Sequence, residues 1–202
     1  KISSPFGAHG VQRTPGSASP LQRAGVHGVQ GEGESAVVKV PAPVAYRTGF
    51  GYDIHRLVEG RPLLLGGVKI DHPKGLLGHS DGDVVLHAVC DALLGAAGAG
   101  EIGRYFPPTD PSIAGISSAE ILRKVVAVLK AKRAWIEHVD IAVVAEQPKL
   151  KDLYSRLQSS LSQLLRVPME RVNLKAKSHE GLGEIGRGEA IACYAVANLT
   201  IR

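Results

Sequence analysis

Hydrophobic and polar residues alternate with a period of two in several segments of the chain, a pattern typical of β-strands. The alternation is clearest in residues 189–201, where the apolar positions of one face are Ile191, Cys193, Ala195, Ala197, Leu199 and Ile201. The same pattern predicts strands at residues 44–55, 62–70, 135–147 and 171–178. Because residues 56–61 form a short polar connection that contains a glycine, the first two strands are expected to pair as a hairpin.

Between these strands the apolar residues recur at helical spacing. Residues 81–97 have a long apolar body and are predicted to form a helix. Ser80 is the expected N-cap, and Asp81 and Asp83 are expected in the first turn, where carboxylates stabilise the positive end of the helix dipole.

Two further helices are predicted. Ser117 is followed three positions later by Glu120, the spacing of a capping box, and the apolar face behind it consists of Ile121, Leu122, Val125, Val128 and Leu129. Pro148 is expected to open the other helix, whose apolar positions are Leu150, Leu153, Leu157, Leu161, Leu164 and Leu165. Together the elements predict an α/β (α+β) sandwich, with a mixed β-sheet of about four to five strands packed on about three helices.

Residues 1–45 differ from the rest of the chain, because they are rich in Gly, Ser, Pro and Gln and show neither period. Such a composition does not bury enough apolar surface to offset the entropy lost on ordering. The sequence therefore predicts one folded domain at residues 46–202. The preceding segment is interpreted either as the remnant of an organelle transit peptide, because acids are scarce in it, or as a disordered extension.

The net charge of +5 comes largely from the beginning of the chain. Residues 48–202 have nearly balanced charges and no basic block, which argues against a nucleic-acid-binding protein. Cys90 and Cys193 lie far apart in apolar patterns, which favours a reducing compartment. No apolar run approaches the roughly 18–20 residues that a membrane-spanning helix needs.

The first candidate for chemistry is the pair Asp53 and His55. Two residues apart on a strand, their side chains share one face of the sheet, and a carboxylate beside an imidazole supplies half of a tetrahedral zinc site. His87, on the predicted helix, is the candidate third ligand. Three protein ligands leave a position for substrate, as in catalytic zinc sites. On spacing alone, such a pair is more often a surface or hydrogen-bonded pair, and that interpretation stays open.

The second candidate is an anion site at His79 and Ser80. The unpaired N–H groups at the start of the following helix favour an anion there. Alternatively, Ser80 only caps the helix and His79 is a solvated loop residue. The anion site gains support because His87 lies about two turns along the same helix, within reach of one anionic ligand.

The glycine-rich segment 181–186 fits the G-x-G-x-x-G spacing of dinucleotide-binding loops. That fingerprint needs a helix after the glycines and an acid about 20 residues later. Residues 189–201 alternate like a strand instead, so a dinucleotide site is rejected. The segment is then a glycine-rich turn that carries Glu180, Glu184 and Arg187. From the sequence, this turn could simply be a flexible hairpin connection.

A series of motifs is similar to the 2-C-methyl-D-erythritol 2,4-cyclodiphosphate synthase family over about residues 46–202. In order they are GYDIHRL, GGVKI, GLLGHSDGDVVLHAVCDALLGAAGAGEIGRYFP, TDP, EQPKL, VNLKAKSHE and GRGEAIACYAVANL. The combination of D-x-H with H-S-D-G-D-x-x-x-H is the most specific part of the resemblance.

The resemblance implies a metal-dependent lyase of the non-mevalonate isoprenoid pathway. Its substrate would be 4-diphosphocytidyl-2-C-methyl-D-erythritol 2-phosphate, whose 2-phosphate attacks the β-phosphorus of the diphosphate. CMP leaves, and 2-C-methyl-D-erythritol 2,4-cyclodiphosphate forms. A transit peptide at residues 1–45 would imply a plastid or plastid-like organelle, and its absence would imply a bacterial cytoplasm.

The resemblance also implies two cations. Asp53, His55 and His87 match ligands of Zn²⁺, with a β-phosphate oxygen at the fourth position. Glu180 matches a ligand of Mg²⁺ or Mn²⁺ that bridges the α- and β-phosphates, and a carboxylate with phosphate oxygens suits such a hard ion.

Further positions match catalytic and substrate-binding residues of the family. His79 and Ser178 match groups that support the attacking phosphate and the leaving group. The methylerythritol portion would lie at Ser80, Ile102 and Gly103. The full set of implied substrate-binding residues is Asp53, His55, His79, Ser80, Glu101, Ile102, Gly103, Thr109, Asp110, Ala145, Pro148, Lys149, Leu150, Lys177, Ser178, His179, Glu180 and Arg187.

The resemblance implies a homotrimer, with sheets facing its centre and active sites between subunits, and neither nucleic acid nor membrane as a partner. Residues 145–151 match the cytidine pocket, and Arg187 matches a residue of the central channel. The chain departs from the common pattern at Glu101, where Asp is frequent, at Pro108, which replaces an acid, and at Glu184, which replaces an apolar residue.

Two other function classes stay open. A metal-dependent phosphohydrolase would use the same three ligands to activate water. A non-catalytic binding module would hold zinc only for its fold, with its fourth coordination position closed.

Overall fold

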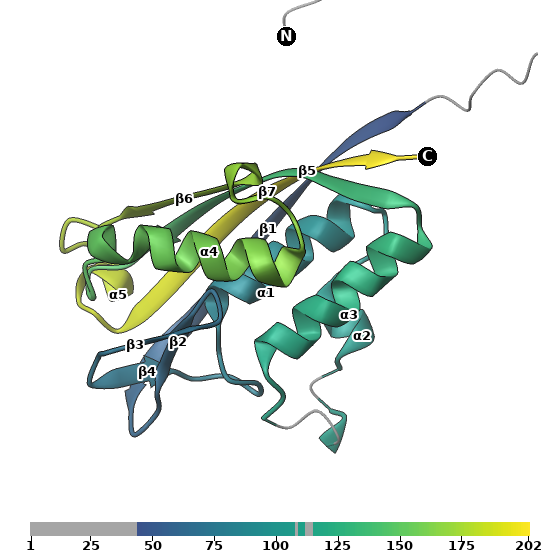
Figure 1. The fold of residues 1–202 in the computed structure, drawn as a ribbon. Helices are drawn as coiled ribbons and strands as arrows, with labels where there is room; N and C mark the ends of the chain where they lie inside the picture. Colours follow the sequence, from purple (N-terminus) through teal and green to yellow (C-terminus); the bar gives the residue numbers. More distant parts are fainter. Residues whose placement is uncertain (1–43, 108, 112–114) are drawn as a thin grey trace, which may run out of the picture. The chain divides into compact units, whose positions relative to one another are not determined.

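The computed structural model describes residues 44–107, 109–111 and 115–202, which form a sheet with helices on one side (Figure 1). The five-stranded sheet has the order β4-β1-β7-β5-β6. Its strands are β1 (Ala45–Glu59), β4 (Lys74–Leu76), β5 (Ala134–Val144), β6 (Val172–Lys177) and β7 (Ala190–Ile201). β5 and β6 are parallel, whereas the β1–β4, β1–β7 and β5–β7 pairs are antiparallel. The expected mixed sheet is confirmed.

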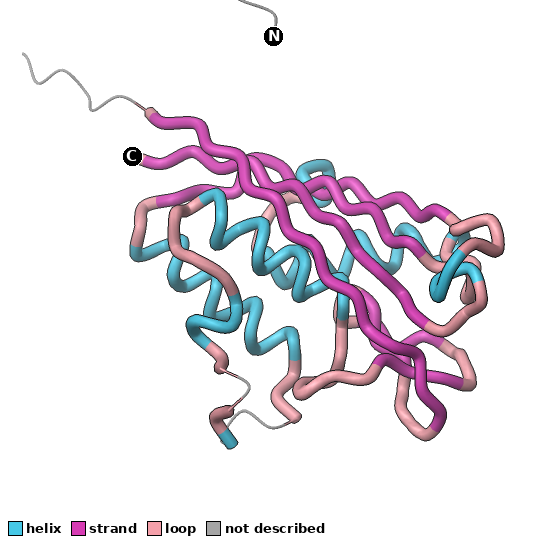
Figure 2. The backbone as a smooth tube through the Cα atoms, turned by 180° about the vertical axis from the view of Figure 1, so that it is seen from behind, coloured by secondary structure: helices cyan, strands magenta, loops and turns pink. Residues whose placement is uncertain are grey.

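The helices are α1 (Val84–Ala96), α2 (Ile102–Tyr105), α3 (Ser118–Ala131), α4 (Tyr154–Leu165) and α5 (Gly183–Gly186). Two 3₁₀ turns occupy Lys151–Leu153 and Met169–Arg171. Seen from behind, the strands lie in front of the long helices, so α1, α3 and α4 cover one face of the sheet (Figure 2). No helix among the described residues combines the length and apolar character needed to cross a membrane.

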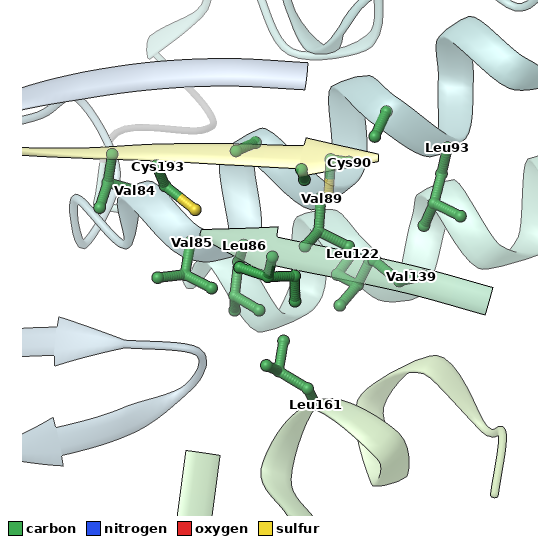
Figure 3. Packing of buried hydrophobic residues seen from close by; sticks show 14 of the residues in the cluster. Val84, Val85, Leu86, Val89, Cys90, Leu93, Leu122, Val139, Leu161 and Cys193 are labelled. Atoms are coloured by element: carbon green, nitrogen blue, oxygen red, sulfur yellow. The ribbon is translucent and has the colours of Figure 1, made fainter. Parts of the chain in front are cut away.

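Helix α1 is the centre of the core. It is buried on nearly every side, because it packs between the sheet and the outer helices. Figure 3 shows Val85, Leu86 and Val89 of α1 facing Leu122 of α3 and Leu161 of α4. The predicted apolar faces of α3 and α4 are the faces that pack on the core, and the apolar body of α1 is buried.

Strand β1 and helix α1 touch through their main chains. Gly49 and Gly51 lie on the strand face that meets the helix, and a Cβ at Gly51 would lie 1.9 Å from the carbonyl oxygen of Ala88. At Gly49 it would lie 2.1 Å from the carbonyl oxygen of Ala92. Only glycine permits this approach, so the sequence of β1 determines how closely α1 lies against it.

The predicted hairpin of residues 44–55 with 62–70 is wrong. Residues 56–59 continue β1, which pairs with β4 and β7. Residues 62–70 fold back on themselves as β2 (Leu63–Leu65) and β3 (Val68–Ile70). Gly66 and Gly67 make the turn with φ of 58° and 78°, and two adjacent residues with positive φ suit a two-residue hairpin.

The predicted helix at Pro148 begins later than expected. Residues 151–153 form a 3₁₀ turn, and α4 starts at Tyr154. The peptide bond before Pro148 is cis, so this proline shapes a loop and does not occupy the first turn of a helix. By contrast, Ser117 caps α3 as predicted, because its hydroxyl accepts a hydrogen bond from the Ala119 N–H at 3.3 Å.

The opposite face of the sheet carries large apolar side chains that no described element covers. Phe50, Tyr52, Ile54 and Tyr194 are 61%, 43%, 43% and 42% exposed. The rings of Tyr52 and Tyr194 lie 4.9 Å apart between centroids. Contiguous exposed apolar surface of this kind typically marks an interaction site. The predicted extension at residues 1–45 lies outside the described residues, apart from Val44 and Ala45.

The contact between β1 and α1 predicts the outcome of two glycine substitutions. Gly51→Ala is expected to lower the free energy of unfolding by about 1–3 kcal/mol or more, because the new methyl group overlaps the carbonyl of Ala88. Gly95→Ala is the matched control: the nearest atom to its new Cβ lies at 3.9 Å, and alanine is the better helix former. Urea unfolding followed by circular dichroism measures both. Equal stability of Gly51→Ala and wild type would contradict the main-chain contact.

Candidate metal centre

Asp53, His55 and His87 converge at one point between the sheet and α1. Asp53 and His55 lie on the same face of β1, and Asp53 Oδ2 is 2.8 Å from His55 Nε2. His87, one residue before the alanine that touches Gly51, places Nδ1 2.9 Å from Asp53 Oδ2 and 3.1 Å from His55 Nε2. The three side chains are 25%, 18% and 14% exposed, so a ligand can still reach them. The predicted three-residue cluster is confirmed as a geometric group.

The donor set suits a cation. A carboxylate oxygen and two imidazole nitrogens are typical zinc ligands, and bonds of about 2.0–2.1 Å in a tetrahedron separate ligand atoms by about 3.3 Å. The observed separations of 2.8–3.1 Å are close to that value. Asp53 Oδ1 accepts a hydrogen bond from the Ile54 N–H at 2.9 Å, which aims Oδ2 at the two histidines. The three groups therefore fit a zinc ion with a further position for another ligand.

The electrostatics of the cluster favour a charged carboxylate. Burial alone raises the pKa of Asp53, but the hydrogen bonds and charges of His55 and His87 outweigh it and hold that pKa well below its usual range. Burial lowers the pKa of His55, yet its hydrogen bond and charge interaction with Asp53 raise it overall. The cluster thus contains an anionic carboxylate between two imidazoles, donor types that suit a divalent cation.

The N-cap of α1 is Asp83, so the prediction of Ser80 as the cap is wrong. The helix begins at Val84, and Asp83 Oδ1 accepts hydrogen bonds from the Val85 and Leu86 N–H groups at 3.1 Å each. Asp81 and Asp83 therefore precede the helix and do not lie in its first turn. Ser80 lies farther back and is buried, with its hydroxyl 3.0 Å from His87 Nε2.

Asp83 also ties the β2–β3 turn to the helix. Its carboxylate accepts the Gly66 N–H at 2.9 Å and the Gly67 N–H at 2.6 Å. The side chain is fully buried, and burial raises its pKa although these N–H donors act in the opposite direction. One carboxylate thus fixes the start of the helix that carries His87, a role that sequence reasoning did not assign to it.

A cavity of about 150 Å³ adjoins the cluster. Its lining combines the polar groups of His55, His79, Ser80 and His87 with the apolar side chains of Ile102, Phe106, Ile116 and Ile121. The predicted site residues that line this cavity are His55, His79, Ser80, His87 and, from α2, Ile102. The cavity suits a small, partly apolar group beside a cation.

The segment before α2 is anchored by a residue that the sequence did not single out. Asp91 of α1 accepts the Ile102 N–H at 2.8 Å, which holds the start of α2 against the helix that carries His87. Glu101 and Gly103 flank this anchor and are exposed. Thr109 is exposed as well, and the Asp110 N–H donates to the Pro107 carbonyl at 2.9 Å.

The predicted residues after β6 form a second group. Ser178 donates a hydrogen bond to the Glu180 carboxylate, and Glu180 has a positive φ of 50°. Glu146 accepts from the His179 and Gly181 N–H groups at 3.3 and 3.4 Å, which joins this turn to the loop after β5. That loop contains the predicted cytidine-pocket residues Ala145, Pro148, Lys149 and Leu150, and the Ala145 N–H donates to the carbonyl of Lys177 at 2.9 Å.

This second group does not meet the cluster within one chain. Lys177 pairs with Val144 of β5, Val144 with Ala192 of β7, and Ala192 with Ile54 of β1. Three strand spacings therefore separate the main chains of Lys177 and Ile54, or about 14 Å at about 4.8 Å each. Glu180 is accordingly not part of the three-residue metal group.

Arg187 belongs to the turn between α5 and β7. It is exposed, and its guanidinium lies 2.9 Å from Glu189 and 3.6 Å from Glu184. The hydrogen bond and charge of Glu189 raise the pKa of Arg187. After the single helical turn of α5, residues 187–189 connect to β7, and a strand rather than a long helix follows the glycines.

Comparisons with known proteins point to one family. The model of the YgbB family matches residues 46–200. The bifunctional enzyme IspD/IspF of Desulforudis audaxviator is 54% identical over 151 residues, which are 75% of this chain and only 38% of that enzyme. The 2-C-methyl-D-erythritol 2,4-cyclodiphosphate synthase of Agathobacter rectalis is 50% identical over 154 residues, 76% of this chain and 87% of the relative.

A solved structure agrees. A 2-C-methyl-D-erythritol 2,4-cyclodiphosphate synthase in a CDP-bound form is 42% identical and aligns with a TM-score of 0.70. The alignment covers 76% of this chain and 99% of that one. The fold and the sequence therefore indicate the same relationship.

The cluster predicts tight binding of a single Zn²⁺ per chain. His55→Ala is expected to weaken zinc binding by more than about 100-fold, beyond the 10–100-fold loss typical of removing an outer hydrogen-bond partner of a ligand. His72→Ala is the matched control, because the His72 ring contacts only the Lys74 backbone in the described hydrogen bonds. Chelator competition on dialysed protein measures the affinities. Equal affinities for the two variants would contradict the assignment of His55 as a ligand.

Proposed function

This chain belongs to the YgbB family, and we propose that it converts 4-diphosphocytidyl-2-C-methyl-D-erythritol 2-phosphate into 2-C-methyl-D-erythritol 2,4-cyclodiphosphate and CMP. The observation that carries the proposal is the cluster of Asp53, His55 and His87 beside a small, partly apolar cavity. The enzyme is thus a metal-dependent lyase of the non-mevalonate isoprenoid pathway.

The reaction is an exchange of phosphorus–oxygen bonds within one molecule. An oxygen of the 2-phosphate forms a bond to the β-phosphorus, and the bond from that phosphorus to the bridging oxygen breaks. CMP leaves with the electron pair, so neither water nor a redox partner is consumed. The protein has to fold a flexible polyanion back on itself and neutralise its charge, which is a task of positioning and electrostatics.

The proposed metal ligands follow from the family resemblance, and their donor types agree with it. Asp53, His55 and His87 would hold Zn²⁺, and Glu180 would hold Mg²⁺ or Mn²⁺. When bound, these ions polarise the phosphoryl groups and offset their negative charge. The exposed carboxylate of Glu180, on a turn with positive φ, supports its availability as a ligand.

The remaining residues have positioning roles. His79, at the rim of the cavity, orients the attacking phosphate, and Ser178 orients the leaving group. The methylerythritol portion lies against Ser80, Ile102 and Gly103, which is supported by the cavity that Ser80 and Ile102 line. Glu101, Thr109 and Asp110 complete its surroundings.

The cytidine group is proposed to bind the loop after β5, at Ala145, Pro148, Lys149 and Leu150. Lys177, Ser178 and His179 adjoin this loop through the hydrogen bonds that join the two turns. Lys149 is exposed, lies 3.6 Å from Glu146 and is proposed to reach the diphosphate. The similar synthase solved in a CDP-bound form supports a cytidine-binding role.

We further propose a homotrimer with active sites between subunits. Two features support it: the exposed aromatic face of the sheet, and the three strand spacings, about 14 Å, between Lys177, at the end of β6 before the Glu180 turn, and Ile54, beside Asp53. A neighbour's Glu180 turn is proposed to lie against the cluster. The sheets then face the trimer centre, and Arg187 lines the central channel.

Two proposals concern the chain's surroundings. The partners are the small-molecule substrate and two further copies of the chain, with no nucleic acid or membrane. Residues 1–45 are proposed to be a transit-peptide remnant directing the domain at residues 46–202 to a plastid or similar organelle; the alternative is a bacterial cytoplasm.

Phosphorus NMR with the cytidyl substrate tests the activity. We expect a cyclic diphosphate and CMP as products, and His55→Ala is expected to lower kcat at least about 100-fold because a metal contributes several kcal/mol to charge stabilisation. His72→Ala is expected to retain activity, and size-exclusion chromatography should show both variants as trimers. Inorganic phosphate as the product would indicate a phosphohydrolase instead, and no turnover a binding module.

Mixing subunits tests the shared site. His55→Ala and Glu180→Gln homotrimers are each expected to be inactive, because every site lacks one half. Random reassembly of equal amounts gives about three quarters mixed trimers, each with about one of its three sites intact, so about a quarter of wild-type activity should return. A mixture that stays inactive would mean that each site lies within one subunit.

A further inference from the structure

His87 has a second ring nitrogen that the metal centre does not use. Nδ1 faces Asp53 and His55, whereas Nε2 points away from them into the protein. There it lies 2.9 Å from the hydroxyl oxygen of Ser118, the first residue of α3. Ser118 is completely buried, and it is not among the residues that line the cavity beside the cluster.

The hydroxyl proton of Ser118 already has an acceptor. Ser118 Oγ donates a short hydrogen bond to Asp81 Oδ1, and the Ser118 N–H donates to Asp81 Oδ2 at 3.0 Å. A carboxylate accepts only, so the proton lies between Ser118 and Asp81. The oxygen of Ser118 therefore presents a lone pair to His87.

This arrangement favours one tautomer of His87 when a cation occupies the cluster. The lone pair on Ser118 accepts a hydrogen from Nε2, and the cation then takes the place of the hydrogen that Nδ1 otherwise donates to Asp53. We assign this tautomer from the hydrogen-bond network. It leaves the lone pair of Nδ1 directed at the point where Asp53 Oδ2 and His55 Nε2 meet.

We propose that Ser118, oriented by Asp81, is a positioning residue that holds the ring and the tautomer of His87 for metal binding through Nδ1. The inference rests on the proposed function, because it needs a cation at the cluster. Metal-binding histidines usually donate their other N–H to a carboxylate or carbonyl. Here a buried hydroxyl stands between the histidine and the carboxylate.

Ser80 contacts the same nitrogen but is less specific for this role. Its hydroxyl lies 3.0 Å from His87 Nε2, accepts the Gly82 N–H at 3.1 Å and lines the cavity. Replacing Ser80 would alter the loop and the cavity together. Ser118 acts from another helix and touches the centre only through His87 and Ser80.

The network also connects the start of α3 to the loop before α1. The Asp81 N–H donates to the carbonyl of Ile116 at 3.2 Å, and the Gly115 N–H donates to the carbonyl of His79 at 2.9 Å. The side-chain and main-chain bonds together hold Asp81 in place, so the orientation of Ser118 does not depend on one contact.

Zinc affinity and the visible spectrum of the Co²⁺-substituted protein test the inference. Ser118→Ala removes the acceptor, and Asp81→Ala frees the hydroxyl proton to be donated to Nε2. Each change is expected to weaken Zn²⁺ binding by about 10–100-fold and to change the Co²⁺ absorption bands, because ligand orientation changes. Ser160→Ala, which removes a hydroxyl bonded to the Gly66 carbonyl at 2.7 Å, is the matched control and should leave both unchanged.

The outcomes separate this inference from the proposed function. If the wild type binds zinc and both Ser118→Ala and Asp81→Ala match its affinity and spectrum, the positioning role is wrong and the metal centre stands. If the wild type binds no zinc, the metal centre and the positioning role fall together. Asp81 is only half-buried, so its variant gives a result even if Ser118→Ala does not fold.

Discussion

Direct contact between the main chains of β1 and α1 is the constraint on which the site depends. Gly49 and Gly51 let the strand approach the helix at Ala88 and Ala92, which no larger residue would permit. Asp53 and His55 lie on the same face of β1 as the two glycines. His87 precedes Ala88, the helix residue that Gly51 contacts. Candidate ligands from two elements therefore come within 3.1 Å of one another.

The local part of this arrangement was predictable from the sequence. A period of two places Asp53 and His55 on one face, and the apolar neighbours of His87 direct it toward the sheet. The helix start was not predictable, because Ser80, Asp81 and Asp83 are all good capping residues. The choice of Asp83 depends on hydrogen bonds to the distant β2–β3 turn, which a local pattern does not contain.

The same limit applies to contacts between elements. Ser118 is ordinary in sequence, as a serine beside a helix cap, and becomes part of the centre only when α3 packs on α1. Strand pairing likewise decides that Ser178 and Glu180 lie three strands from Asp53. No residue spacing reveals that separation, so the family resemblance alone suggested that one site needs two chains.

Main-chain atoms, and not side-chain volume, set the distance between β1 and α1. Core residues on the other sides of the helix, such as Leu86 and Leu93, pack away from this contact. The spacing of β1 and α1 beside the cluster therefore depends on two glycines, and not on how the large side chains fill the interior.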